Sequence, residues 1–179
     1  MDRQTSGDIP VIVITGPVGS GKSTVMDAMS LLLAARGLRH AAIDQDYLRV
    51  VHPYPDDEPF GATVGYRNLA AIWPILLDYG VRCVVIADVV EDRAASLAAY
   101  TAAKPGTTIA VVRLNVPMVV ILQRLEGRET ASSIDWYRHR ALELQGIMER
   151  NKVEDVLIEV GERLPHAVAL EILEKLDIV

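Results

Sequence analysis

A glycine-rich segment near the start of the chain has the residues of a phosphate-binding loop. Residues 16–23 read Gly-Pro-Val-Gly-Ser-Gly-Lys-Ser, a complete G-x-x-x-x-G-K-[ST] motif, and they directly follow the apolar run 9–15. Between a strand and a helix, such a loop surrounds a polyphosphate with backbone N–H groups and adds the partial positive charge of the helix N-terminus. Lys22 is expected to reach the β- and γ-phosphates, and Ser23 is expected to offer its hydroxyl to Mg²⁺. The alternative, an ordinary glycine-rich turn, is disfavoured by this strand-to-helix setting. The residues expected to bind the nucleotide are Gly16, Gly19, Ser20, Gly21, Lys22, Ser23 and Thr24.

Three aspartates stand where predicted strands end, and ligands of parallel sheets collect beyond the carboxyl ends of the strands. Asp44 or Asp46 is expected to orient and deprotonate an acceptor hydroxyl, or to hold Mg²⁺ through water. The alternative for either one is a cap on the turn or short helix that follows. Asp88 ends an apolar strand as a Walker-B carboxylate does, so we expect it to support Mg²⁺. In that case Asp46 is free to act as the base.

Four arginines flank a polar segment at about 127–135, which we predict to be a small lid. Arg124 and Arg128 are four residues apart, on one face of a predicted helix, while Arg138 and Arg140 open the next helix. Arginine suits phosphoryl transfer because its planar fork matches phosphate oxygens, so we assign Arg124, Arg128 and Arg138 to the transferred group. The alternative is a solvated charged face, since glutamates lie nearby.

Contacts to the acceptor are harder to locate. Arg67 and Asn68 begin a predicted helix and, with Arg140, are our candidates for binding the acceptor. The segment 52–61 has three prolines and three acids in ten residues, so it is no regular element; it is a functional loop or a mobile surface insertion. The rim of a pocket for the nucleotide base is expected at 161–163.

The alternation of β-branched apolar runs with helical periodicity predicts an α/β fold in one domain, residues 1–179, with a five-stranded parallel sheet and helices on both faces. Pro74 lies inside a predicted helix, where it predicts a kink. Strands are predicted near 9–15, 40–44, 81–88, 107–114 and 155–160, and helices near 21–36, 66–79, 91–103, 116–126, 135–151 and 165–177.

Composition narrows the function classes. The net charge of −6 argues against a broad nucleic-acid surface, and no apolar run approaches the roughly 20 residues of a membrane span. Residues 1–8 are polar and lack the apolar segment of an export signal, so we expect a cytoplasmic protein. The four histidines lack metal-ligand spacing, and Cys83 is alone, so it cannot form an intrachain disulfide. The oligomeric state stays open, with a homodimer as one option.

With these residues in place, the chain resembles the small-molecule kinases of the P-loop superfamily, most of all the adenylylsulfate kinase and nucleotide kinase branch. The phosphate loop 16–23 matches that of the family, and Asp44-Gln45-Asp46 is similar to its Asp-Gly-Asp. The helix that starts at Asn68 and the lid arginines are similar too, but residues 88–93 depart from the Ser-Pro-Tyr-Arg type of segment that adenylylsulfate kinases carry. The resemblance implies a P-loop NTPase fold.

The residues and the resemblance together predict an ATP- and Mg²⁺-dependent transfer of the γ-phosphate to a hydroxyl of a small metabolite. A more specific alternative is an adenylylsulfate kinase or a nucleoside or nucleotide kinase. An alternative from another class is a regulatory ATPase switch, in which hydrolysis changes a surface and no metabolite is phosphorylated. The predicted lid favours the kinase, because excluding water protects ATP from wasteful hydrolysis.

Overall fold

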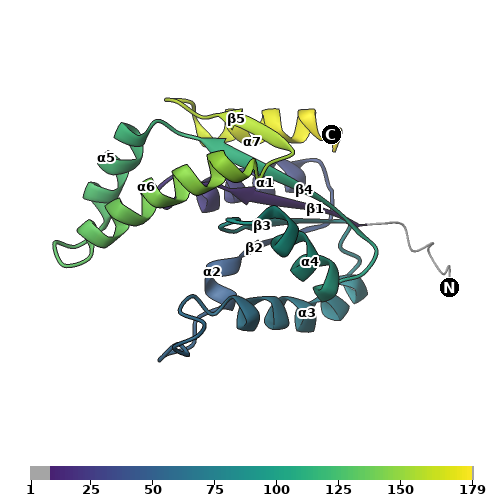
Figure 1. Ribbon diagram of the computed structural model, residues 1–179. Helices are drawn as coiled ribbons and strands as arrows, with labels where there is room; N and C mark the ends of the chain where they lie inside the picture. Colours follow the sequence, from purple (N-terminus) through teal and green to yellow (C-terminus); the bar gives the residue numbers. More distant parts are fainter. Residues whose placement is uncertain (1–8, 179) are drawn as a thin grey trace, which may run out of the picture.

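Five parallel strands form one sheet in the computed structural model, which describes residues 9–178 (Figure 1). The strand order is β2-β3-β1-β4-β5, and β1 pairs with β3 on one side and β4 on the other. Because β1 is central, the loop that follows it opens at the middle of the carboxyl edge of the sheet. The prediction about an export signal in residues 1–8 lies outside the described residues. The strands are β1 (Ile9–Thr15), β2 (His40–Asp44), β3 (Cys83–Ala87), β4 (Thr107–Asn115) and β5 (Val156–Glu159).

The predicted helices are all present, with end points that differ by a few residues. Helix α3 begins four residues earlier than expected, directly after Gly61, and it runs through Pro74 to Asp78. A short additional helix, α2, follows β2. Across residues 9–178, no helix combines the length and the apolar composition that crossing a membrane requires. The helices are α1 (Lys22–Ala35), α2 (Gln45–Leu48), α3 (Ala62–Asp78), α4 (Arg93–Ala103), α5 (Met118–Arg128), α6 (Ile134–Asn151) and α7 (Pro165–Lys175).

Helices cover both faces of the sheet, as predicted, and each face has its own apolar core. Successive side chains of a strand point to opposite faces. On β1, Ile12 and Ile14 therefore pack with residues of α1, α5 and α7, whereas Val11 and Val13 pack with residues of α3, α4 and α6. Being buried on both sides explains why β1 and β3 read as continuous apolar runs rather than alternating ones.

Helices α5 and α6 form an antiparallel pair that extends beyond the sheet (Figure 1). The connection between them, residues 129–133, lies within the predicted lid at 127–135. The Arg128 guanidinium, at the end of α5, lies 5.7 Å from the centre of the Tyr137 ring on α6. The two helices therefore contact each other next to this connection. That the connection closes over a ligand stays a prediction.

Candidate active site

The phosphate loop joins β1 to α1 in a form that leaves N–H groups free for a ligand. Gly21 precedes α1 without any side-chain cap, and the first helical hydrogen bond runs from Val25 N–H to Gly21 O at 3.0 Å. The N–H groups of Lys22, Ser23 and Thr24 thus have no partner within the helix. The first turn of α1 contains no acidic residue, so no carboxylate there competes with phosphate for these N–H groups.

Close packing within the loop explains one of its glycines. A Cβ at Gly16 would lie 2.7 Å from the Ser20 hydroxyl oxygen and 3.3 Å from the carbonyl oxygen of Leu114. The Ser20 hydroxyl is buried and has no hydrogen-bond partner among the described residues. A buried hydroxyl without a partner is costly. The loop thus has an unused polar group as well as free N–H groups, which fits a polyphosphate.

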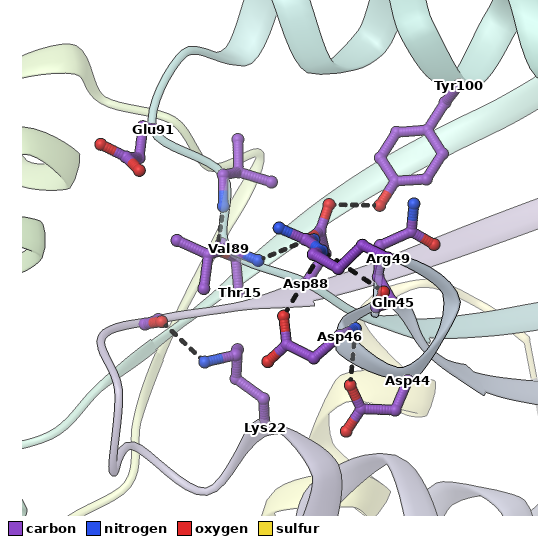
Figure 2. Close-up of polar contacts among 12 residues, drawn as sticks. Thr15, Lys22, Asp44, Gln45, Asp46, Arg49, Asp88, Val89, Glu91 and Tyr100 are labelled. Carbon is purple, nitrogen blue, oxygen red and sulfur yellow. Dashed lines mark hydrogen bonds and ion pairs between the residues drawn. The ribbon is translucent and has the colours of Figure 1, made fainter. Parts of the chain in front are cut away.

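The Lys22 ammonium lies along the inside of the loop (Figure 2). Its Nζ donates to the carbonyl oxygens of Gly16, at 3.1 Å, and Pro17, at 3.4 Å. Burial lowers the pKa of Lys22, an effect that the nearby carboxylates of Asp46 and Asp88 oppose. Neutral carbonyls are weak hydrogen-bond partners for a buried ammonium. An anionic ligand in the loop would be a stronger partner for the Lys22 ammonium.

Asp44 connects the end of β2 to the phosphate loop. Its Oδ2 accepts a hydrogen bond of 2.6 Å from the Ser23 hydroxyl. Its Oδ1 accepts one of 3.0 Å from the backbone N–H of Asp46, so it also caps α2. The capping role that the sequence left as an alternative is therefore present, together with a position beside the phosphate loop.

Asp46 is the more accessible of the two carboxylates. Its side chain is 65% exposed and lines the pocket described below, whereas that of Asp44 does not. Its Oδ1 lies 3.6 Å from Nε of Arg49, which is a loose ion pair. The carboxylate is thus available to a second ligand.

Asp88, at the end of β3, is the most completely buried carboxylate of the site. It accepts hydrogen bonds from the Arg49 guanidinium, from the Tyr100 hydroxyl at 2.7 Å and from Val89 N–H at 2.8 Å (Figure 2). Burial raises the pKa of Asp88, while the Arg49 charge and the Tyr100 hydroxyl oppose the change. The three donors directed at the carboxylate stabilise its ionised form against the effect of burial. Its predicted Mg²⁺ role stays a prediction, because both oxygens already have partners.

Two partners of Asp88 were not anticipated from the sequence. Burial lowers the pKa of Arg49, but the charges of Asp88 and Asp46 outweigh this and raise it, as in a stable ion pair. Tyr100 extends from α4, and its ring meets that of Tyr66 edge to face, with centres 5.1 Å apart. Burial, reinforced by the Asp88 charge, raises the pKa of Tyr66 to about 12. Arg49 and the two tyrosines therefore form a partly buried network around one carboxylate.

The lid arginines divide into those that reach the pocket and one that does not. Arg124 donates to the carbonyl oxygen of Ser20 at 3.1 Å, and both Arg124 and Arg128 line the pocket. Arg140 also lines it and pairs with Glu91 and Glu143. Arg138 is absent from the lining. Its guanidinium pairs instead with Glu126, at 2.7 Å, and Asp135, at 3.3 Å, so it forms the charged surface that was the alternative.

The predicted acceptor contacts on α3 also lie outside the pocket lining. Arg67 and Asn68 are exposed. The Asn68 amide donates to the carbonyl oxygen of Leu48 at 2.7 Å, which ties the end of α2 to α3. The preceding residue, Tyr66, lines the pocket in their place. Asn68 thus helps to position α2, with Asp46 on it.

One pocket of about 960 Å³ joins these groups, a volume at the upper end for small-molecule sites. It is lined by the phosphate loop, by Asp46 and Asp88, and by aromatic side chains of the segment 52–61, α3 and α6. A smaller cavity of about 220 Å³ is lined by Arg124, which also lines the first pocket, and by Arg163. That cavity lies where the base pocket was expected. Its other lining residues are Ser20, Gly21, Thr24, Val25, Val160, Pro165 and Val168.

Comparisons with known proteins show a similar phosphate-loop region and a similar fold. The family model described as the P-loop containing region of AAA domain matches residues 2–43. No curated protein matches the chain by sequence. Among solved structures, a shikimate kinase from Acinetobacter baumannii in complex with shikimate is 21% identical, with a TM-score of 0.60 over 95% of this chain and 94% of that one. A tunicamycin resistance protein from Deinococcus radiodurans is 17% identical, with a TM-score of 0.63 over 94% and 95% of the two chains. The APS kinase of Mycobacterium tuberculosis in complex with AMPPNP and APS is 22% identical, with a TM-score of 0.61 over 96% and 99%.

The three structural matches extend over nearly the whole chain and confirm the predicted α/β fold, which a shikimate kinase and an APS kinase share. The family model supports the P-loop region over residues 2–43. At such low identity the likeness concerns the fold, and the TM-scores do not separate one kind of kinase from another.

Proposed function

We propose that this chain, whose fold is that of the P-loop small-molecule kinases, transfers the γ-phosphate of ATP to a hydroxyl of a small molecule. The observation that carries the proposal is the pocket of about 960 Å³. It is lined both by the phosphate loop, including Lys22 and Ser23, and by an accessible carboxylate, Asp46, with aromatic side chains beyond the loop. A site that only hydrolyses ATP needs no room for a second organic molecule.

The residues of the pocket divide the work of transfer. The free N–H groups at the start of α1 and the Lys22 ammonium bind the polyphosphate. Asp46 accepts the proton of the acceptor hydroxyl as the hydroxyl oxygen attacks the γ-phosphorus, while the bond from that phosphorus to the β,γ-bridging oxygen breaks and ADP leaves. We prefer Asp46 to Asp44 for this role, because Asp46 lines the pocket while Asp44 is engaged by Ser23. Arg124 and Arg128, which also line the pocket, steady the charge of the transferred group.

The same site suits Mg²⁺. The Ser23 hydroxyl and the Asp44 carboxylate present adjacent oxygen atoms beside the phosphate loop, which is the ligand type that Mg²⁺ prefers. Within residues 9–178 no group of three or more His, Cys, Asp or Glu could hold a metal by itself. A magnesium ion here would therefore be held jointly with phosphate oxygens, as is usual for this ion. When bound, it neutralises phosphate charge. Asp88 would contribute only through water or after leaving Arg49.

The nucleotide base is assigned to the smaller cavity beside the phosphate loop. Arg124 and Arg163 both line it, and a guanidinium plane is a good stacking surface for an aromatic ring. Pro165 and Val168 supply apolar contacts. These contacts favour a planar base without selecting between adenine and guanine.

The neighbouring structures support transfer to a small molecule. One is an APS kinase that contains AMPPNP and APS, and another is a shikimate kinase that contains shikimate. A regulatory ATPase switch is the rival. The AAA match reaches only from residue 2 to 43, the phosphate loop and its surroundings, so it is compatible with both functions.

Lys22→Ala tests the proposal. The purified wild type should consume ATP when Mg²⁺ and a member of a hydroxylated-metabolite panel are supplied, and Lys22→Ala should consume none with any member. Lys104→Ala is the matched control, because that lysine contacts only the carbonyl oxygen of Pro105 and lies outside the pocket lining. Full activity of Lys22→Ala would remove the assignment. ATP consumption that ignores every metabolite but rises with a protein partner would support the switch.

A further inference from the structure

We infer that the acceptor is a hydroxyl-bearing molecule with an apolar, ring-containing body and no acidic group. The inference rests on the proposed phosphotransfer and specifies the class of molecule that the pocket accepts beside the nucleotide. It comes from three features of the lining: its aromatic side chains, the pairing of two of its arginines with carboxylates, and the carboxylates that line it.

Aromatic side chains from three separate segments converge on the pocket. Two of them are large and apolar yet remain open to solvent: Phe60 is 46% exposed and Trp136 is 54% exposed. When an apolar ligand covers apolar rings that are exposed on a pocket wall, the burial of their surface favours binding. A small sugar acid would cover little of this surface, whereas a ring-containing body would cover much of it. The aromatic lining residues are Tyr54, Phe60, Tyr66, Trp136 and Tyr137.

Two of the arginines that line the pocket, Arg140 and Arg49, already have carboxylate partners. Arg140, only 13% exposed, pairs with Glu91 and with Glu143, and its guanidinium lies 5.0 Å from the centre of the Phe60 ring. Arg49 pairs with the buried Asp88. An acidic group on the acceptor would have to compete with these pairs, and removing one partner of a buried pair is costly.

Negatively charged side chains also line the pocket. Besides the buried Asp88, they are Asp46, Glu91 and Asp92. Among the lining residues that the structure describes, the remaining cations are Lys22, Arg124 and Arg128. All three are assigned to the polyphosphate and its transferred group. An acidic acceptor would therefore meet repulsion without a free cation to offset it.

The wall that carries Tyr54 and Phe60 is packed against the site. Gly61 has φ +59°, and a Cβ there would lie 2.5 Å from the carbonyl oxygen of Arg49 and 2.8 Å from the Tyr54 ring. The segment 52–61, which the sequence left as either a functional loop or a mobile insertion, thus contacts the residue that holds Asp88. This packing favours the functional reading.

Matched acceptors test the inference. A panel of hydroxylated aromatic compounds is assayed with labelled ATP and Mg²⁺, each member beside an analogue that differs by one carboxylate; 4-nitrophenyl β-glucoside and 4-nitrophenyl β-glucuronide are one such pair. The acid-free members should have kcat/KM values at least about tenfold higher, equivalent to about 1.4 kcal/mol. They should also raise the melting temperature further in the presence of a non-hydrolysable ATP analogue.

Variants then locate the contact. Trp136→Ala and Phe60→Ala should each raise KM for the acid-free acceptors about tenfold and leave ATP affinity unchanged. Tyr79→Ala is the matched control, because this aromatic ring is 73% exposed and lies outside the pocket lining. Glu91→Gln should leave Arg140 with one carboxylate partner, Glu143, and raise kcat/KM for the carboxylate-bearing analogues several-fold relative to wild type.

The outcomes separate this inference from the function on which it rests. Phosphate transfer to the acidic analogues at equal or higher kcat/KM would overturn the acceptor class and leave the phosphotransferase intact. Unchanged KM in Trp136→Ala and Phe60→Ala would overturn it as well. Release of label only as inorganic phosphate, with neither series stabilising the protein, would overturn both.

Discussion

The Ser23 hydroxyl donates a 2.6 Å hydrogen bond to Oδ2 of Asp44 and thereby joins the phosphate loop to the end of β2. Asp46, two residues further on, does not share this contact and faces the pocket. Two carboxylates that look equivalent in the sequence therefore have different surroundings. One lies where a metal bound to phosphate would be held, and the other lies where an acceptor hydroxyl would be.

Conservative substitutions should separate the two roles. In Asp44→Asn the cap of α2 is retained, since Asn is as good an N-cap as Asp, but the charge is lost. We expect the Mg²⁺ concentration for half-maximal activity to rise about tenfold or more. In Asp46→Asn that concentration should stay the same while kcat falls about 10²- to 10⁴-fold. Titrating Mg²⁺ in steady-state assays of both variants measures this, and the reverse pattern would exchange the two assignments.

The Asp88 carboxylate should matter for stability as well as activity. Asp88→Ala leaves the Arg49 guanidinium largely buried without its partner, and breaking a buried pair in this way costs about 3–5 kcal/mol. Urea denaturation followed by circular dichroism measures the loss in the free energy of unfolding. Asp135→Ala, at a pair whose carboxylate is 81% exposed, is the control and should leave the midpoint nearly unchanged. Equal midpoints for the two variants would contradict the role given to Asp88.

As the pH rises, ATP affinity should begin to fall at a lower pH than it would if Lys22 had the pKa of an ordinary lysine. Burial lowers the pKa of Lys22 from the ordinary value of 10.5, so Lys22 loses its proton at a lower pH than an exposed lysine does. Since phosphate binds the charged form, the dissociation constant for ATP should increase in the alkaline range below pH 10.5, the ordinary pKa of lysine. Calorimetric titrations at several pH values measure it. In Lys22→Arg the guanidinium stays charged, so its affinity, whatever its level, should vary less over this range. A flat wild-type profile would contradict the account.

Gly61 should tolerate a side chain less well than a glycine of similar backbone conformation. Gly37 has φ +69° with open space around it, whereas Gly61 has φ +59° and close neighbours. Both alanine variants bear the left-handed cost of about 1–2 kcal/mol. Gly61→Ala should lose about 1–3 kcal/mol more because of overpacking. It should also raise the acceptor KM, because the wall at 52–61 must shift. Equal losses in the free energy of unfolding would show that this wall is loosely packed.

Local patterns in the sequence were enough to predict the sheet, the long helices and the phosphate loop. The runs that became β1 and β3 are apolar throughout because both faces of the sheet are covered. Helix α2 was anticipated only as an alternative to a turn, because four residues are too few to show a helical period. Its one local signal was Asp44, a residue type that favours helix N-termini.

The partners of the site residues were harder to predict. Asp88 meets Arg49, 39 positions away, and no periodicity reports such a contact. Arg138 and Arg140 were both assigned to the cleft, but residues two apart on a helix point in different directions. Only Arg140 lines the pocket. The same geometry explains why Tyr66 lines it while Arg67 and Asn68 are exposed.

The fate of the γ-phosphate tests the central claim most directly. Wild-type protein is incubated with γ-³²P-labelled ATP, Mg²⁺ and the acid-free hydroxylated aromatic panel, and the labelled products are separated by chromatography. The account predicts a labelled organic phosphate that depends on the acceptor, that phosphatase converts to inorganic phosphate, and that is missing with Lys22→Ala. Label found only in inorganic phosphate, at a rate that no acceptor changes, would contradict it.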